Sequence, residues 1–154
     1  MKFRRGDVLW IRCDPSVGVE PRKTRTCVVI SNDKANQHAA AITVVPTVEW
    51  TEERAARFYM VDLRRPGSTL PDRRLANCSM ITTYDRNRIV KYAGAASPAA
   101  LGAIEQAVQR HLGFLVDALE AREREVEYEI RARLPRTSAV AVTARRRQRP
   151  RTAR

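Results

Sequence analysis

Residues 5–47 decide the fold, and they read RGDVLWIRCDPSVGVEPRKTRTCVVISNDKANQHAAAITVVPT. Three runs of apolar and β-branched residues, typical of strands, lie at 7–13, 24–31 and 42–45. Turn residues follow the first run, and the polar, basic sequence EPRKTR then occupies 20–25. Loops held by a rigid sheet are a common location for binding and catalytic groups. The stretch therefore predicts a β structure that presents a charged loop.

Short strands continue after this stretch. They are predicted at residues 57–63, 78–83 and 89–93. Turns or loops are predicted between them, at 32–38 and at 64–68, whereas residues 51–55 fit either one helical turn or an exposed loop. Several short strands at this spacing favour a small barrel or sandwich. The expected fold class is thus mainly β.

A helix is predicted to follow the last strand. Ser97 is a good N-cap and Pro98 suits the first helical position. One apolar face, which we expect to dock on the barrel, is formed by Leu101, Ile104, Val108, Leu112, Leu115 and Leu119. Residues 1–118 are therefore expected to form the barrel with its C-terminal helix. A charged helical extension is predicted at 119–135 and an Arg-rich disordered tail at 136–154.

The chain carries a large positive charge that is unevenly distributed. Its 154 residues suit one domain with a substantial core, and its formal net charge is +12. Residues 131–154 contain nine arginines and no acidic residue, which leaves +3 for residues 1–130. Such a charge predicts a polyanionic partner, namely RNA, DNA or an anionic membrane. The tail itself fits two interpretations, a non-specific contribution to RNA affinity or a flexible solvated segment.

Metal, cysteine and histidine chemistry find little support in the sequence. The three cysteines, Cys13, Cys27 and Cys78, are widely spaced in apolar surroundings, and the two histidines lack ligand spacing. Buried free thiols are therefore expected, with no metal site and no cofactor. The first residues contain no apolar segment of signal-peptide length, and no stretch approaches membrane-spanning length. A cytoplasmic protein is predicted.

The remaining reactive side chains permit one reaction in particular. Arg, Thr, Ser and an occasional Glu suit a metal-independent attack of a ribose 2′-hydroxyl on its neighbouring phosphate, since the substrate then supplies the nucleophile. The protein has to orient the phosphate, stabilise its added negative charge and move protons. A guanidinium offers a rigid fork of donors to phosphate oxygens, and preorganised donors in a partly dry groove stabilise such a charge strongly.

Five motifs give this possibility a specific form. They are RGDVLW at 5–10, DPSVGVE at 14–20, KTR at 23–25, VVISND at 28–33 and VVPT at 44–47. In order and spacing they resemble the MazF/PemK toxin family, and the resemblance extends over about residues 4–118. It implies an SH3-like barrel of the CcdB/PemK type that forms a homodimer. It also implies a sequence-specific endoribonuclease that cleaves single-stranded mRNA, and a cognate antitoxin whose C-terminal segment occupies the RNA groove.

The resemblance assigns roles to three residues. Arg25 corresponds to the family's catalytic arginine, Thr47 to the residue that helps stabilise the transition state, and Glu20 to the supporting loop acid. Because arginine does not readily lose its proton, we expect Arg25 to act as an electrostatic stabiliser and proton donor rather than as a base. Contacts with RNA are further expected from Arg22, Lys23, Thr24, Thr26, Asn36 and Thr83.

Three departures from the family pattern leave an alternative open. Thr26 stands where the family usually has a proline after its catalytic arginine, and Met80 and Thr82 replace the Gln and Arg of many members. These changes are compatible with altered specificity or weaker activity. The alternative is a barrel that does not cleave RNA but binds nucleic acid or a protein target such as DNA gyrase, as CcdB-type barrels do.

Overall fold

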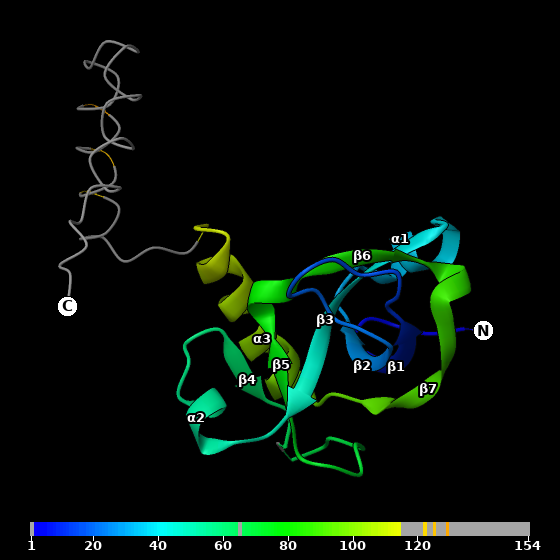
Figure 1. Cartoon of the computed structure of the whole chain (residues 1–154), viewed down its shortest axis with the longest axis horizontal. Helices are drawn as coiled ribbons and strands as arrows, with labels where there is room; N and C mark the ends of the chain where they lie inside the picture. The colour runs from blue at the N-terminus through cyan, green and yellow to red at the C-terminus, as the bar shows by residue number, and fades with distance from the viewer. Residues whose placement is uncertain (1, 65, 115–121, 123–124, 126–128, 130–154) are drawn as a thin grey trace, which may run out of the picture. The chain divides into compact units, whose positions relative to one another are not determined.

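The computed structural model describes residues 2–64, 66–114, 122, 125 and 129. Its strands are β1 (Asp7–Arg12), β2 (Thr24–Val29), β3 (Ala41–Glu49), β4 (Met60–Asp62), β5 (Arg74–Asn77), β6 (Thr82–Asp85) and β7 (Ile89–Ala95). The α-helices are α1 (Asp33–His38), α2 (Glu52–Ala55) and α3 (Pro98–His111), and short 3₁₀ turns cover Cys78–Met80 and Arg86–Arg88. The predicted mainly β fold with a C-terminal helix is confirmed (Figure 1).

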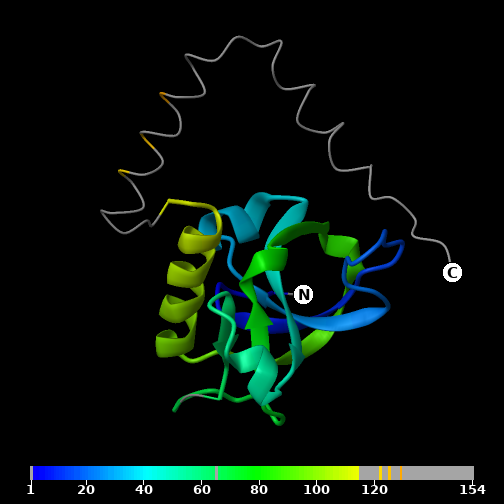
Figure 2. The same ribbon diagram turned by 60° about the vertical axis from the view of Figure 1, so that its left-hand side comes forward.

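The strands form one curled antiparallel sheet in the order β4-β5-β3-β2-β1-β7, with β6 paired to β3. Strand β3 joins the two parts of this sheet. Its first residues, 41–44, pair with β6, residues 44–46 pair with β2, and residues 47–49 pair with β5. In Figures 1 and 2, α3 runs beside β4 and β5, while β6 and β7 curve around the opposite part of the sheet.

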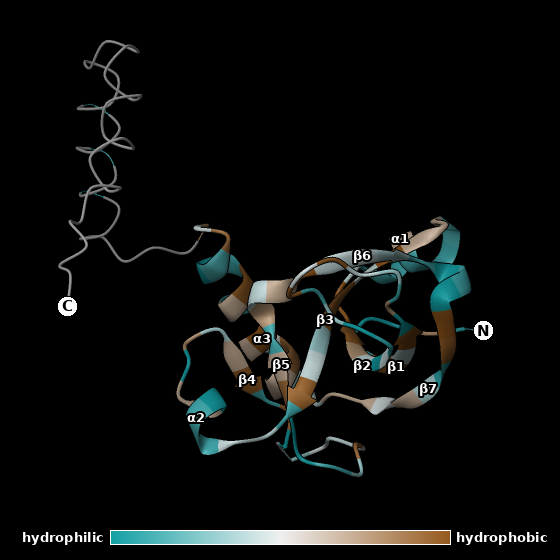
Figure 3. Ribbon diagram, viewed as in Figure 1, coloured by the Kyte–Doolittle hydropathy of each residue, from teal (hydrophilic) through white to brown (hydrophobic). Residues whose placement is uncertain are grey.

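Both faces of the three central strands are buried, which explains their nearly continuous apolar sequence. Successive side chains of a strand point to opposite faces. Val8, Val28 and Val45 therefore pack with α3 and β4 in one core, and the residues that alternate with them pack in a second core inside the curl. That second core contains Phe3, Leu9, Ile11, Cys27, Val29, Ile42 and Val44. Hydrophobic colours accordingly gather on the strands, whereas α2 is hydrophilic (Figure 3).

Helix α3 begins as predicted and ends earlier than the apolar pattern suggested. The Ser97 hydroxyl accepts a hydrogen bond from the Ala100 N–H (3.2 Å), and Ile104 is fully buried against the first core. The helix stops at His111, and Gly113 adopts a φ of 77°, a conformation that glycine tolerates best. Leu112 is consequently 48% exposed rather than part of the docked face. Leu115 and Leu119 lie outside the described residues.

Several predicted element boundaries were wrong. Residues 33–38 form α1 rather than a loop, because the Asn32 side chain accepts the Ala35 N–H (2.8 Å) and caps a helix. The predicted strand at 78–83 is a 3₁₀ turn followed by β6, and β5 precedes it at residues that were assigned to no element. Strand β4 has only three residues, fewer than the predicted strand at 57–63. Of the two interpretations left open for 51–55, the helical turn is confirmed as the short helix α2.

The barrel and α3 lie within one compact unit, residues 1–115. Of the predicted extension at 119–135, only Arg122, Glu125 and Glu129 are described; each is helical and exposed. The predicted tail at 136–154 lies outside the described residues. Within the described part of the chain, no helix has the length and apolar character needed to cross a membrane.

Candidate functional site

The candidate site is a groove that opens where β2 and β3 separate. Their ladder runs from Val29 paired with Val44 to Cys27 paired with Pro46, and it stops there. Pro46 has no N–H to donate, so it is a natural end for a ladder. Beyond it β2 stays with β1, whereas β3 turns to β5 through Thr47–Glu49. The resulting groove has a volume of about 480 Å³ and contains both predicted catalytic strand residues, Arg25 and Thr47.

Arg25 lies near the start of β2, is exposed, and is paired with Ile11 in the β1–β2 ladder. Its Nε donates a hydrogen bond to the Arg22 carbonyl oxygen (3.1 Å), which orients the guanidinium. Its two terminal nitrogens have no hydrogen-bond partner among the described residues. The Nε hydrogen bond therefore holds the guanidinium in place, and the two terminal nitrogens are able to bind an anion.

Thr47 lies on the floor of the groove and is only 1% exposed. Its hydroxyl oxygen is 2.5 Å from that of Thr26, which is 3% exposed on the facing strand. If the β2–β3 register is continued by one residue past the ladder, Thr26 lies opposite Thr47. The two hydroxyls thus bridge the first position at which the strands have separated. Thr26 was predicted to contact RNA, but its side chain is occupied by Thr47 and does not line the groove.

The loop between β1 and β2 forms one wall of the groove. Glu20 is exposed, and its Oε2 accepts a hydrogen bond from the Val17 N–H (2.8 Å), while Arg22 donates to the Gly18 carbonyl oxygen (2.7 Å). Both side chains line the groove together with Arg25. Lys23 is exposed beside it, and its N–H donates to an Asp14 carboxylate oxygen (2.9 Å). These bonds give the charged loop a defined shape rather than leaving it as an unstructured solvated segment.

The opposite wall contains residues that sequence reasoning missed. Arg54 and Arg57 come from α2 and the residues after it, and Asn77 and Met80 come from the end of β5 and the turn that follows. Their positions depend on the pairing of β3 with β5, so no local pattern could have revealed them. The complete lining contains four arginines and two glutamates, which makes the groove electropositive. Its charge suits a phosphate backbone.

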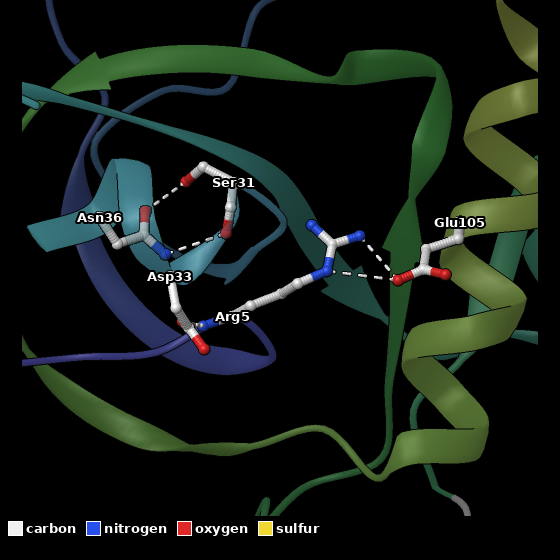
Figure 4. Close-up of polar contacts among 5 residues, drawn as sticks. All are labelled: Arg5, Ser31, Asp33, Asn36 and Glu105. Atoms are coloured by element: carbon white, nitrogen blue, oxygen red, sulfur yellow. Dashed lines mark hydrogen bonds and ion pairs between the residues drawn. The ribbon is translucent and has the colours of Figure 1, made fainter.

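Of the six predicted RNA contacts, only Arg22 lines this groove; the other five are Lys23, Thr24, Thr26, Asn36 and Thr83. Asn36 is 3% exposed in α1, and its amide is used internally: its Oδ1 accepts the Ser31 hydroxyl (2.6 Å) and its Nδ2 donates to the Ser31 carbonyl (2.9 Å). Figure 4 shows this pair close to Asp33, whose carboxylate accepts the Arg5 N–H (2.7 Å). The side-chain amide of Asn36 is thus hydrogen-bonded within the fold and is not presented to the groove. Thr24 is exposed at the start of β2, and Thr83 lines a neighbouring cavity.

The three cysteines are buried and free, as predicted. Cys13 borders the neighbouring cavity. A hydrogen bond from the Cys27 thiol, with smaller ones from Tyr84 and the Arg25 backbone, outweighs burial and lowers the pKa of Cys13 to about 6. The same hydrogen bond and burial raise the pKa of Cys27, and burial alone raises the pKa of Cys78 to about 12. The described residues contain no group of three or more His, Cys, Asp or Glu side chains arranged to hold a metal ion.

Known proteins share this fold. The structure resembles MazF from Deinococcus radiodurans with a TM-score of 0.62, at 18% identity, covering 71% of this chain and 96% of that one. An endoribonuclease in complex with its cognate antitoxin, from a mycobacterial species, gives a TM-score of 0.59 at 23% identity, covering 75% of this chain and 100% of that one. At these identities the similarity establishes the fold.

Similarity in sequence identifies the family as well as the fold. The curated endoribonuclease MazF9 of Mycobacterium tuberculosis (strain ATCC 25618 / H37Rv) is 30% identical over 117 residues, covering 71% of this chain and 96% of the relative. The family model described as PemK-like, MazF-like toxin of type II toxin-antitoxin system matches residues 4–112, which include the whole groove. The chain therefore belongs to the PemK-like, MazF-like family of toxins of type II toxin–antitoxin systems.

Proposed function

We propose that this toxin is an endoribonuclease that cleaves single-stranded RNA in the groove between β2 and β3. The reaction is attack of a ribose 2′-oxygen on the adjacent phosphorus, with cleavage of the P–O5′ bond. Its products are a 2′,3′-cyclic phosphate and a 5′-hydroxyl end. The single observation that carries the proposal is the convergence of Arg25, Thr47 and Glu20 on one electropositive groove.

The reaction requires stabilisation of negative charge and transfer of protons, and different groups in the groove serve these two purposes. Negative charge accumulates on the phosphate oxygens during attack, and the outer nitrogens of Arg25 together with the Thr47 hydroxyl are donors for them. A proton must also leave the 2′-oxygen and another must reach O5′. Glu20 is the one loop carboxylate on the groove wall, so we assign it the support of proton transfer. Arg25 supplies charge and a donated hydrogen rather than a base.

The other groove arginines account for binding of the substrate chain. Arg22 lines the groove on its loop wall, and Arg54 and Arg57 line it on the opposite wall. Phosphates on either side of the scissile bond have a cation within this lining, which favours an extended single strand over a compact ligand. Lys23, Thr24 and Thr83 are retained as outer RNA contacts on account of their exposure.

We further propose a protein partner and an oligomeric state. One similar structure is an endoribonuclease in complex with its cognate antitoxin, and we expect a cognate antitoxin to neutralise this chain by covering the groove. A homodimer in the cytoplasm is proposed as well. In the described part of the chain, β7 ends the sheet, and its Val90 and Tyr92 are 52% and 51% exposed, which gives a dimer an apolar surface to bury.

The decisive experiment incubates the purified full chain with a single-stranded RNA transcript in EDTA and maps the ends. We expect 5′-hydroxyl ends, and no cleavage where the nucleotide before the scissile bond is 2′-deoxy. Arg25→Ala should lower the cleavage rate by at least about 100-fold, and Arg25→Lys should restore little because an ammonium lacks the fork of donors. Lys34→Ala removes an exposed cation from α1 and is the matched control.

Two outcomes would refute the proposal in different ways. Undiminished cleavage by Arg25→Ala would exclude the assigned site. Tight binding of RNA by the unmodified chain without any cleavage would instead favour the non-cleaving barrel, and inhibition of purified DNA gyrase would then be the next measurement.

A further inference from the structure

We propose that Thr26 is a positioning residue that orients the hydroxyl of Thr47 for RNA cleavage. The inference rests on the proposed function and adds to it a residue that does not itself line the groove. Thr26 also stands at the position where the sequence departs from the proline expected by resemblance. A proline there would have no hydroxyl, so the hydrogen bond between the Thr26 and Thr47 hydroxyls depends on this departure.

The geometry places the two hydroxyls at the opening of the groove. The β2–β3 ladder ends at Cys27 and Pro46, and the next facing pair is Thr26 and Thr47. Their oxygens are 2.5 Å apart, at the short end of the range for O–H···O hydrogen bonds. Both side chains are almost fully buried, at 3% and 1% exposure. Within the described residues the Thr26 hydroxyl has no other hydrogen-bond partner.

The direction of this hydrogen bond decides whether the Thr47 hydroxyl can donate into the groove. Each hydroxyl has one hydrogen and two acceptor lone pairs, so only one hydrogen lies between the two oxygens. If Thr47 donates to Thr26, the Thr47 hydrogen is used inside the protein. If Thr26 donates to Thr47, the Thr47 hydrogen is free to point into the groove while its oxygen stays anchored.

Phosphate selects the second arrangement. A phosphate oxygen can only accept hydrogen bonds, so its entry favours the state in which Thr47 donates to it and accepts from Thr26. The two bonds then form a chain in which each polarises the other. Because charge on the phosphate rises during attack, the bond from Thr47 gains most in the transition state. The effect of Thr26 should therefore appear mainly in kcat and much less in KM.

The test is a double-mutant cycle in the full chain with a fluorescent single-stranded RNA oligonucleotide. Thr26→Val keeps the shape of the side chain and removes its hydroxyl, and we expect kcat to fall roughly 10-fold with KM nearly unchanged. Thr26→Ser should restore most of the rate. In a Thr47→Ala background, Thr26→Val should have no further effect on kcat, since the residue through which it acts is gone. Thr69→Val, which removes a hydroxyl outside the groove lining, is the control for a general loss of hydroxyl bonding.

A merely structural role predicts a different pattern. In that case Thr26→Val would lower the thermal midpoint and leave kcat intact below it; this result would overturn the inference. If Thr47→Ala cleaves as fast as the unmodified chain, the assignment of Thr47 in the proposed function fails. If Thr47→Ala lowers kcat but Thr26→Val does not, the positioning role of Thr26 fails and the assignment of Thr47 stands.

Discussion

Replacing Asn36 with alanine should destabilise the fold and leave the rate of RNA cleavage unchanged. Asn36 makes two hydrogen bonds with Ser31, at 2.6 and 2.9 Å, and it is 3% exposed. A buried hydrogen bond of this kind contributes about 1 kcal/mol net, so the loss of both should lower the free energy of unfolding by about 2 kcal/mol. The Ser31 hydroxyl keeps its contacts with the Thr43 backbone, which limits the cost.

The measurement is urea unfolding followed by circular dichroism, together with the initial rate of cleavage at a temperature where both proteins are folded. For a folded unit of this size, a loss of about 2 kcal/mol corresponds to a fall in Tm of roughly 8 °C. Gln37→Ala is the matched control, because Gln37 is the neighbouring α1 residue and is exposed. Its effect should stay within about 0.5 kcal/mol.

One result would refute the structural assignment of Asn36. If Asn36→Ala were as stable as Gln37→Ala while its cleavage rate fell about 10-fold or more, the side chain would have to act on RNA. The predicted RNA contact would then be restored, and the bonds to Ser31 would have to rearrange when RNA binds.

Two further predictions concern the core and the thiols. Ile104→Ala should reduce stability by about 2–5 kcal/mol because Ile104 is fully buried where α3 docks, whereas Leu112→Ala should change it by less than about 1 kcal/mol; equal midpoints in urea unfolding would contradict this. Iodoacetamide should label Cys13 before Cys27 and Cys78 in the folded chain, and peptide mass spectrometry checks the order. Since the pKa of Cys13 is lowered to about 6 and that of Cys78 is raised to about 12, the Cys13 rate should be nearly constant above pH 7 and fall below pH 6.

The parts of the fold that the sequence predicted are those stabilised locally or buried on both faces. Strands β1, β2 and β3 are continuous apolar runs because cores form on either side of them. The start of α3 was predicted from Ser97 and Pro98, a capping pair that needs no tertiary contact. Such signals are contained within a few neighbouring residues.

The errors have physical causes that can be stated for each element. Asn32 was interpreted as part of a turn, but the same side chain that favours turns also caps helices, and here it caps α1. Strand β5 has only four residues and exists because β3 and β4 pair with it on either side. Gly113 ends α3 inside a pattern whose apolar spacing continues, so the period alone extended the helix too far.

The candidate site shows the same difference between residues that a local motif reveals and residues whose positions depend on the pairing of distant strands. Arg25 and Thr47 were predicted because the motifs that contain them resemble a known family, and the structure brings both to one groove. Arg54, Arg57 and Asn77 were not predicted, since they reach the groove only through the pairing of distant strands. Asn36 was expected to contact RNA, whereas its burial beside Ser31 depends on α1, an element that was missed.

The position of Pro46 connects the sequence to the chemistry. It ends the β2–β3 ladder, and the two strands then follow different partners. This separation brings consecutive β3 residues, Pro46 to Glu49, to the lining of one groove. Across the opening, Arg25 is exposed and held at one nitrogen, whereas Thr47 is buried and fixed by Thr26. An exposed cation and a buried hydroxyl thus line the same groove, and preorganised donors of these kinds suit the charge that the proposed reaction would develop on a phosphate.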